Sequence, residues 1–170
     1  GLSITDDPLI VRGSSSRPFD GEGVTGERLA MIEDGVLQHW FLSTSTANEL
    51  GLRTNGRGVR GGTSVNPAST NLALEPGDIS PEDLIRSIGN GFYITELIGQ
   101  GVNMVTGEYS RGASGYWIEN GELTFAVSEV TIASNLTDMF LRITPANDID
   151  RSFGVAAPTL AIEGMTLAGT

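Results

Sequence analysis

The sequence predicts a mainly β protein of the α+β class, with antiparallel sheets in a barrel- or sandwich-like arrangement and two short helices. The dipeptides Asp34-Gly35 and Asn120-Gly121 each separate two apolar segments, as in hairpins with two-residue turns. Glycine is frequent, at 23 of 170 residues, with short apolar runs between the glycines. Because charged residues make up only 18% of the chain, we expect a folded protein with one domain over residues 1–170. The abrupt start with a strand-like segment suggests a domain cut from a longer protein.

The strands are predicted from the two turns outward. Asp34-Gly35 is expected to join residues 28–33 to residues 36–42 through a type I′ turn, which needs positive φ at both central positions. Asn120-Gly121 is expected to join residues 116–119 to residues 122–125 in the same way. Val127, Glu129, Thr131 and Ala133 alternate with Ser128, Val130 and Ile132 in a period-two pattern, which is typical of a strand. Further strands are predicted at residues 92–98, 129–133, 159–163 and 165–168.

Helices are predicted at two places. Ser80 is a favoured N-cap, Pro81 suits the first helical position, and two acidic residues follow in the first turn. A second helix is predicted over residues 135–143, and a short helical turn around residues 47–50. Residues 54–63, rich in glycine, arginine and asparagine, predict a mobile loop outside the core.

Composition excludes several classes of function. The net charge is −11 and all ten basic residues are arginines, so we expect no direct binding of nucleic acid. The absence of lysine excludes a Walker-type phosphate site and Schiff-base chemistry. The absence of cysteine excludes thiol nucleophiles and thiolate metal sites. No apolar run of about 18 residues is present and the N-terminus does not resemble a signal peptide, so we expect a cytoplasmic protein without a membrane span.

Candidate catalytic and metal-binding groups are few. The only histidine, His39, is expected in a packed or half-exposed strand position beside Trp40, and a structural role is favoured. A zinc site would need mainly carboxylates, so we expect no metal on this chain. The glycines at 99 and 101 begin like a dinucleotide-binding fingerprint but lack the third glycine and a following helix. Five glutamates could pair across strands for acid–base work, although no spacing forces any two together: Glu96, Glu108, Glu119, Glu122 and Glu129.

The segment from Thr95 to Gly115 is the strongest candidate for a binding site. It is predicted to be a long, glycine-rich connection between strands, and such connections are often functional. A glycine-rich backbone also lets another chain approach closely. The alternative is a purely architectural turn. The hydrogen-bonding side chains among its glycines are Gln100, Asn103, Tyr109, Ser110 and Arg111.

The same segment closely resembles the TldD/PmbA family. The similarity lies in TELIGQGVN at 95–103, TGEYSRG at 106–112, GYWIENGE at 115–122 and VSEVTIASNL at 127–136. It extends to SRPFDGEGV at 16–24, to the NLxLEPG pattern at 71–77 and to the end of the chain. The resemblance implies the C-terminal domain of a longer protein.

In this family a TldD-like subunit carries an HExxxH zinc helix and a cysteine ligand, whereas a TldE/PmbA-like subunit lacks them. Residues 150–157, where the TldD-like cysteine would lie, contain no cysteine, which favours the TldE/PmbA type. The resemblance therefore implies a metal-free subunit whose TldD-like partner holds zinc, and unfolded or modified peptides as substrates. The family name of gyrase modulator then describes an indirect effect. A peptide cleft or subunit interface is expected at Glu96, Gln100, Gly101, Asn103, Tyr109, Ser110 and Arg111.

Two alternatives stay open from the sequence. One is a metallopeptidase in its own right, which the inventory of possible metal ligands opposes. The other is a non-enzymatic module that binds peptides or assembles without a catalytic partner. A homodimer is plausible in either case when the chain is alone, because a domain that pairs with a similar fold can usually pair with itself.

Overall fold

The computed structural model describes residues 1–169 and confirms a mainly β protein of the α+β class, with several antiparallel sheets. The chain divides into two compact units, each described separately. Unit 1 comprises Gly1–Pro76 with Ile149–Pro158, and unit 2 comprises Gly77–Asp148 with Thr159–Thr170. None of the four sheets closes into a barrel within the described part of the chain. The single domain over residues 1–170 stays a prediction.

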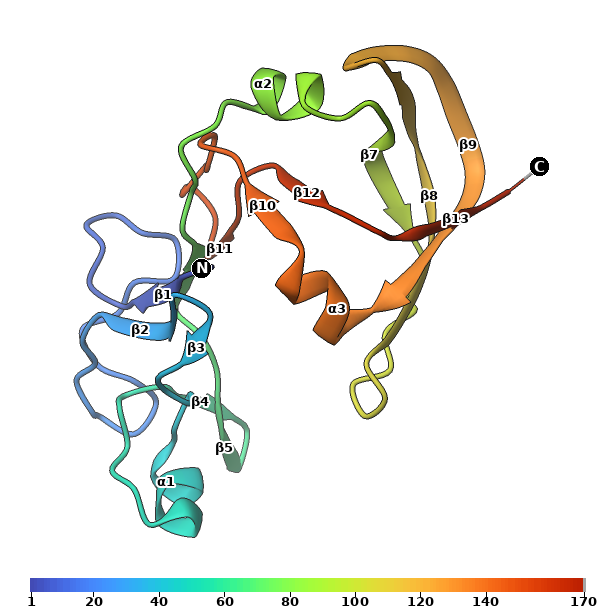
Figure 1. Ribbon diagram of the computed structural model, residues 1–170. Helices are drawn as coiled ribbons and strands as arrows, with labels where there is room; N and C mark the ends of the chain where they lie inside the picture. The colour runs from blue at the N-terminus through green and yellow to red at the C-terminus, as the bar shows by residue number, and fades with distance from the viewer. Residues whose placement is uncertain (170) are drawn as a thin grey trace. The chain divides into compact units, whose positions relative to one another are not determined.

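Unit 1 contains a five-stranded sheet (Figure 1). Its order is β11 (Val155–Ala156), β6 (Asn71–Leu74), β1 (Ile4–Asp7), β2 (Leu29–Glu33) and β3 (Val36–Leu37). All neighbours are antiparallel except β11 and β6. A separate two-stranded sheet joins β4 (Gly58–Gly61) to β5 (Ser64–Pro67).

The first predicted hairpin is confirmed at its turn, while its second strand is shorter than expected. Asp34 and Gly35 have φ of 49° and 82°, as a type I′ turn requires. Strand β3 ends at Leu37, because the N–H groups of Gln38 and His39 both point to the carbonyl oxygen of Met31 and the chain leaves the ladder. The prediction that His39 lies in a packed or half-exposed strand position is therefore wrong: His39 is exposed and lies outside the strand.

The predicted mobile loop at residues 54–63 is also wrong. Residues 58–61 form β4 in a regular antiparallel pair, and Arg57 is fully buried. The helical turn around residues 47–50 is confirmed as α1 (Thr44–Leu50), which has a capping box at Ser43 and ends at Gly51 in the left-handed conformation.

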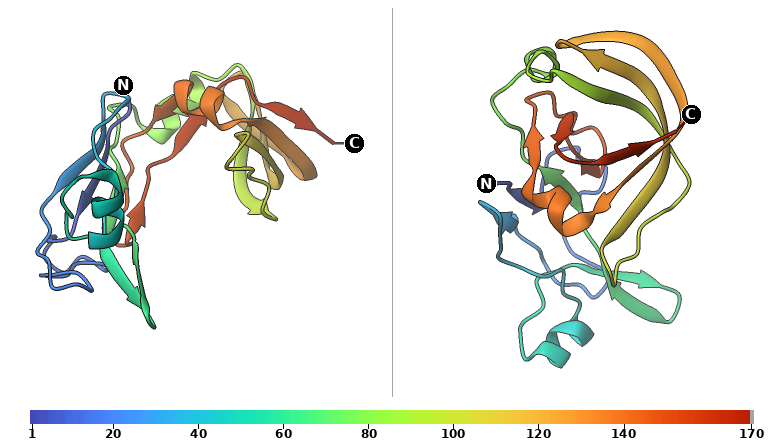
Figure 2. Two further views of the ribbon diagram at one scale, coloured as in Figure 1. Left: turned by 90° about the horizontal axis from the view of Figure 1, so that it is seen from below. Right: turned by 45° about the vertical axis from the view of Figure 1, so that its right-hand side comes forward.

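Unit 2 contains a four-stranded sheet in the order β13 (Thr166–Ala168), β9 (Glu122–Asn135), β8 (Glu108–Glu119) and β7 (Asn90–Ile98). Strands β8 and β9 form a long, strongly curved hairpin (Figures 1 and 2). A separate pair joins β10 (Ile143–Pro145) to β12 (Leu160–Ile162). The last two predicted strands thus exist but belong to different sheets.

The second hairpin turn is confirmed, since Asn120 and Gly121 have φ of 52° and 81°. The core of the sheet is a buried cluster of Ala113, Val130 and Ile132. The predicted alternation along residues 127–133 is interrupted where Ala113 pairs with Val130 but Gly115 pairs with Val127. This β-bulge places one extra residue on β9, so Val127 packs against the same cluster as Val130.

Both predicted helices of unit 2 are present. Helix α2 (Pro81–Arg86) has Ser80 as its N-cap, and α3 (Leu136–Leu141) has Asn135 as its N-cap. Within residues 1–169 we find no helix with the length and apolar character needed to cross a membrane.

Candidate functional site

The candidate site lies in the connection between β7 and β8, residues 99–107. The predicted long connection from Thr95 to Gly115 is wrong, because strands occupy most of residues 95–115 and nine residues remain between them. Those nine are themselves ordered: the Ser110 N–H donates to Gly101 O at 2.7 Å, and the Asn103 N–H donates to Glu108 O at 2.8 Å. The hairpin ladder therefore continues into the connection.

Gly101 is required by this close approach. A Cβ at Gly101 would lie 1.5 Å from the carbonyl oxygen of Ser110, a distance that no side chain can occupy. Beyond it, Asn103 Oδ1 accepts hydrogen bonds from the N–H groups of Val105 and Thr106, at 3.0 and 3.2 Å. Both acceptor positions of Oδ1 are used, so only the amide nitrogen of Asn103 can serve a ligand.

A shallow cavity of about 320 Å³, largely open to solvent, lies beside this connection, lined by Gln100, Gly101, Val102, Asn103, Glu108 and Ser110. Four predicted site residues therefore share it: Gln100, Gly101, Asn103 and Ser110. Glu108 and Val102 complete the lining. Glu108 was predicted only as one of five scattered carboxylates, and Val102 carried no polar signal.

The other three predicted site residues do not line this cavity. Glu96 lies on β7 opposite Ser114. Tyr109 is half-buried and packs against the core cluster of the sheet. Arg111 donates from Nη2 to the carbonyl oxygen of Leu97 at 3.3 Å, which ties β8 to β7.

The glutamates do not form a catalytic pair. Of the five, the strand register brings only Glu119 and Glu122 opposite each other, on either side of the Asn120-Gly121 turn. Both are exposed. The geometry gives no enclosed pair of carboxylates for acid–base work.

A second cavity of about 320 Å³ lies in unit 1 around His39. A structural role was predicted for this histidine, and no sequence pattern indicated a cavity around it. Its lining combines three leucines, Trp40, His39 and four polar residues: Glu27, Leu29, Gln38, His39, Trp40, Leu42, Leu52, Arg53 and Asn55. Because these residues come from three separate chain segments, local sequence patterns could not bring them together.

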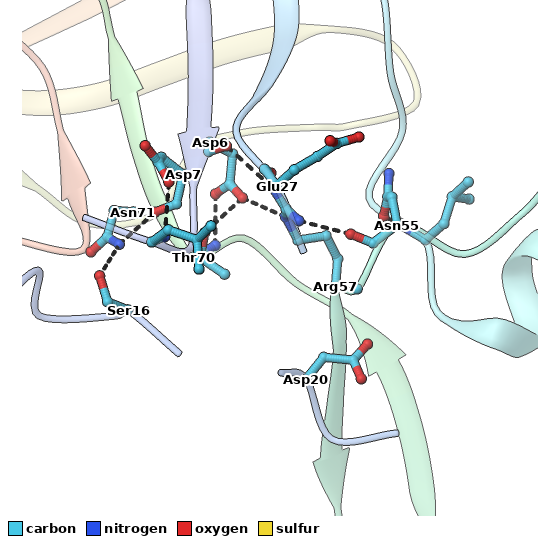
Figure 3. A network of polar contacts seen from close by, with 12 residues as sticks. Asp6, Asp7, Ser16, Asp20, Glu27, Asn55, Arg57, Thr70 and Asn71 are labelled. Carbon is cyan, nitrogen blue, oxygen red and sulfur yellow. Dashed lines mark hydrogen bonds and ion pairs between the residues drawn. The ribbon is translucent and has the colours of Figure 1, made fainter. Parts of the chain in front are cut away.

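A buried ion pair lies within the same unit (Figure 3). Arg57 and Asp6 have fully buried side chains, and Arg57 Nε donates to Asp6 Oδ2 at 2.6 Å. Thr70 donates to the same carboxylate from its N–H and its hydroxyl group, at 2.6 and 2.7 Å. The guanidinium also donates to the carbonyl oxygens of Asp6, Glu27 and Asn55, at 3.2, 2.8 and 2.8 Å. Every charge in this pair is therefore hydrogen-bonded, as burial requires.

Two carboxylates elsewhere in unit 1, Glu75 and Asp20, have lowered pKa values. Burial acts to raise the pKa of Glu75, but the Thr5 hydroxyl and the nearby Arg151 and Arg28 outweigh it and lower the pKa. Burial likewise acts to raise the pKa of Asp20. Its carboxylate accepts hydrogen bonds from backbone N–H groups, and these lower the pKa overall. Both groups therefore favour the ionised, structure-forming state.

The residues present do not fit a zinc ion. Residues 1–169 contain no group of three or more His, Cys, Asp or Glu side chains arranged to hold a metal. The chain has no cysteine, and its only histidine contacts the carbonyl oxygen of Ala30 through Nδ1 at 2.8 Å. Zinc sites in proteins normally need several nitrogen or sulfur ligands.

Comparisons with known proteins agree over the whole chain. The family model described as PmbA/TldA metallopeptidase C-terminal domain matches residues 1–169. The chain is 41% identical over 169 residues to the metalloprotease PmbA of Escherichia coli O157:H7, covering 99% of this chain and 36% of that relative. It is 25% identical over 186 residues to a TldD homologue of Buchnera aphidicola, covering 99% of this chain and 38% of the relative. The chain thus spans little more than a third of the length of the curated relatives it matches.

Solved structures have the same fold. A protein of Thermotoga maritima, described as a candidate modulator of a DNA gyrase, superposes with a TM-score of 0.86 at 36% identity, covering 98% of this chain and 39% of that one. TldE from Thermococcus kodakarensis gives a TM-score of 0.85 at 23% identity, covering 99% and 40%. At this low identity, the likeness to TldE shows the fold alone.

Proposed function

We propose a function from the premise that this chain belongs to the PmbA/TldA metallopeptidase family, as its C-terminal domain. The proposal is that it is part of a metal-free subunit that pairs with a zinc-bearing, TldD-like subunit and helps to bind unfolded or modified peptides for cleavage. Such a subunit would act in the cytoplasm, and alone it would form homodimers.

The observation that carries the proposal is that the chain is more similar to PmbA than to the TldD homologues and has no cysteine and only one histidine that could bind a zinc ion. Identity is 41% to PmbA and 25–28% to the TldD homologues, which favours the PmbA/TldE type. No cysteine lies in residues 150–157, and residues 1–169 hold no group of three or more possible metal-ligating side chains. A domain of this composition supports binding and assembly, and it supplies no Lewis acid for hydrolysis.

The cavity at the β7–β8 connection supports the binding part of the proposal. It offers the amide group of Gln100, the amide nitrogen of Asn103, the Ser110 backbone and the Glu108 carboxylate, on a turn with its own internal hydrogen bonds. Amides can pair with peptide N–H and C=O groups without regard to sequence. A site of this kind suits peptides of varied sequence. An effect on gyrase would then be indirect, through peptide substrates, because a net charge of −11 opposes contact with DNA.

The test is a cleavage assay with the full-length protein and the TldD-like subunit of the same organism, using an unstructured peptide. Cleavage that needs both proteins supports the proposal. Cleavage by this protein alone that a chelator stops would overturn it, and so would cleavage that ignores its presence.

Variants connect the assay to the cavity. Gln100→Ala is expected to reduce cleavage by the pair several-fold, because one lost hydrogen bond is worth about 0.5–1.5 kcal/mol. Asn48→Ala is the matched control, since Asn48 is an exposed amide on α1 outside this cavity. Equal activity of the two variants would remove Gln100 from the peptide-binding surface.

A further inference from the structure

The His39 cavity has walls that are held together by hydrogen bonds. Asn55 joins two of its sides: Oδ1 accepts from the Leu42 N–H at 3.1 Å, and Nδ2 donates to the Trp40 carbonyl oxygen at 2.8 Å. The Thr54 hydroxyl donates to the Leu42 carbonyl oxygen at 3.1 Å. The segment 38–42 is therefore attached to the segment 52–55.

The buried ion pair holds the remaining side. Arg57 donates to the carbonyl oxygens of Glu27 and Asn55, both at 2.8 Å, and both of these residues line the cavity. Figure 3 shows the guanidinium between these two residues. Because Arg57 is itself fixed by Asp6, the distance between the two sides is set before any ligand arrives. A preformed cavity avoids the ordering cost that weakens binding to flexible surfaces.

The lining favours a neutral, apolar ligand group. Leu29 and Leu42 are buried, while Leu52 and Trp40 keep 51% and 59% of their surface exposed. The two charged residues in the lining, Glu27 and Arg53, have opposite signs and so give the cavity no net charge. About 320 Å³ is at the lower end of the roughly 300–1,000 Å³ typical of ligand pockets, which suits one large side chain better than an extended ligand.

His39 adds an acceptor of defined position. Its Nδ1 lies 2.8 Å from the Ala30 carbonyl oxygen, and a carbonyl can only accept, so Nδ1 carries the proton. In the neutral ring Nε2 is then a hydrogen-bond acceptor. Because three leucines and Trp40 line the cavity beside this acceptor, it matches an apolar side chain that is followed along its chain by an N–H group.

We propose that this cavity binds a single large apolar side chain of a polypeptide, with His39 Nε2 accepting a hydrogen bond from a backbone N–H of the same segment. The choice of a polypeptide over a free small molecule rests on the proposed function. Trp40 supplies the aromatic wall, and Arg57 acts only by holding the walls in place.

The test is titration of the 170-residue chain with two capped tripeptides, acetyl-Ala-Phe-Ala-amide and acetyl-Ala-Gly-Ala-amide, followed by backbone amide NMR. We expect saturable shifts at residues 38–42 and 52–55 with the phenylalanine peptide, and affinity at least about tenfold weaker with the glycine peptide, since burying such a ring is worth about 1.5–3 kcal/mol. Equal affinities, or shifts confined to other residues, would overturn the proposal. Toluene that saturates the same shifts while neither peptide does would assign the cavity to small apolar molecules instead.

Matched variants locate the site. Leu52→Ala is expected to weaken the phenylalanine peptide several-fold, and Leu50→Ala, which truncates a leucine of similar exposure outside the cavity, is expected to change nothing. His39→Leu keeps the bulk and removes the acceptor, so it should weaken the normal peptide but not one N-methylated after phenylalanine. A loss of the same size for both peptides would refute the role given to His39.

This experiment is independent of the proposed function. Binding to the chain alone needs neither zinc nor a partner subunit. If neither tripeptide binds but this protein and the TldD-like subunit together still cleave their peptide, only the cavity inference is overturned. If the phenylalanine peptide binds but this protein has no effect on cleavage by the TldD-like subunit, only the partner-subunit proposal is overturned.

Discussion

Arg57→Ala is expected to destabilise unit 1 severely, because it removes one partner of a fully buried ion pair. Asp6 would stay in the interior with no cation beside it, and both side chains have no exposed surface in the intact protein. Removing one member of a buried pair typically costs about 3–5 kcal/mol, since the remaining charge loses its compensation. Urea unfolding followed by circular dichroism measures the change in the free energy of unfolding.

The magnitude follows from what the variant leaves unpaired. Arg57 donates to four acceptors: the Asp6 carboxylate and the carbonyl oxygens of Asp6, Glu27 and Asn55. Thr70 still donates twice to the carboxylate, so that group keeps two of its three donors. The three carbonyl oxygens lose this donor entirely. Since whole domains are stable by only about 5–15 kcal/mol, a loss of 3–5 kcal/mol removes a large share of the total.

The matched control is Arg86→Ala. Arg86 pairs with Asp83 on the surface of α2, and the two side chains are 69% and 58% exposed. Exposed pairs contribute about 0–1 kcal/mol, because water screens them. If Arg57→Ala cost no more than Arg86→Ala, the central role of the buried pair would be refuted.

Three further perturbations test the local structure. Gly101→Ala places Cβ 1.5 Å from a carbonyl oxygen and is expected to cost more than the usual 1–3 kcal/mol of overpacking, whereas Gly89→Ala enters open space; urea unfolding compares them. Asn103→Ala removes the acceptor for the amides of residues 105 and 106, so hydrogen exchange at those two amides should accelerate with little change elsewhere. The lowered pKa of Glu75 means that its stabilisation is complete above the unfolded pKa and is lost as the pH falls through the folded pKa; Glu75→Gln should therefore flatten the stability curve on its acid side, below about pH 4.3, and an unchanged acid limb would contradict this.

The sequence predicts well those features that are determined locally. Asp34-Gly35 and Asn120-Gly121 need positive φ at both turn positions, and few other dipeptides supply it, so both turns form where expected. The helix after Ser80 forms for a similar reason, since its cap, proline and acids are all within one turn. The curvature and bulge of β8 and β9 depend on contacts between strands and are not visible in the alternation pattern.

The features that the sequence could not predict depend on distant partners. Arg57 lies among glycines, which is typical of a loop, and it is buried because Asp6 and Thr70, 51 and 13 residues away, satisfy its charge and share its network. The predicted β7–β8 connection was longer than the observed one. The reason is that, in the sequence, glycines that allow two backbones to approach look the same as glycines that allow flexibility. Gly101 belongs to the first kind, and only the position of Ser110 reveals it.

The buried Arg57–Asp6 pair and the His39 cavity are structurally connected, since Arg57 donates hydrogen bonds to residues on two of the cavity walls. Stability and ligand binding in unit 1 should therefore be coupled in one direction only. Loss of Arg57 disturbs both, because the walls lose their common support. Loss of the Leu52 side chain, which is half-exposed and takes no part in the network, should weaken binding while leaving the free energy of unfolding nearly unchanged. If Leu52→Ala lowered stability as much as it lowered affinity, the apolar lining would be part of the core of unit 1 and the cavity would be a packing defect with no ligand of its own.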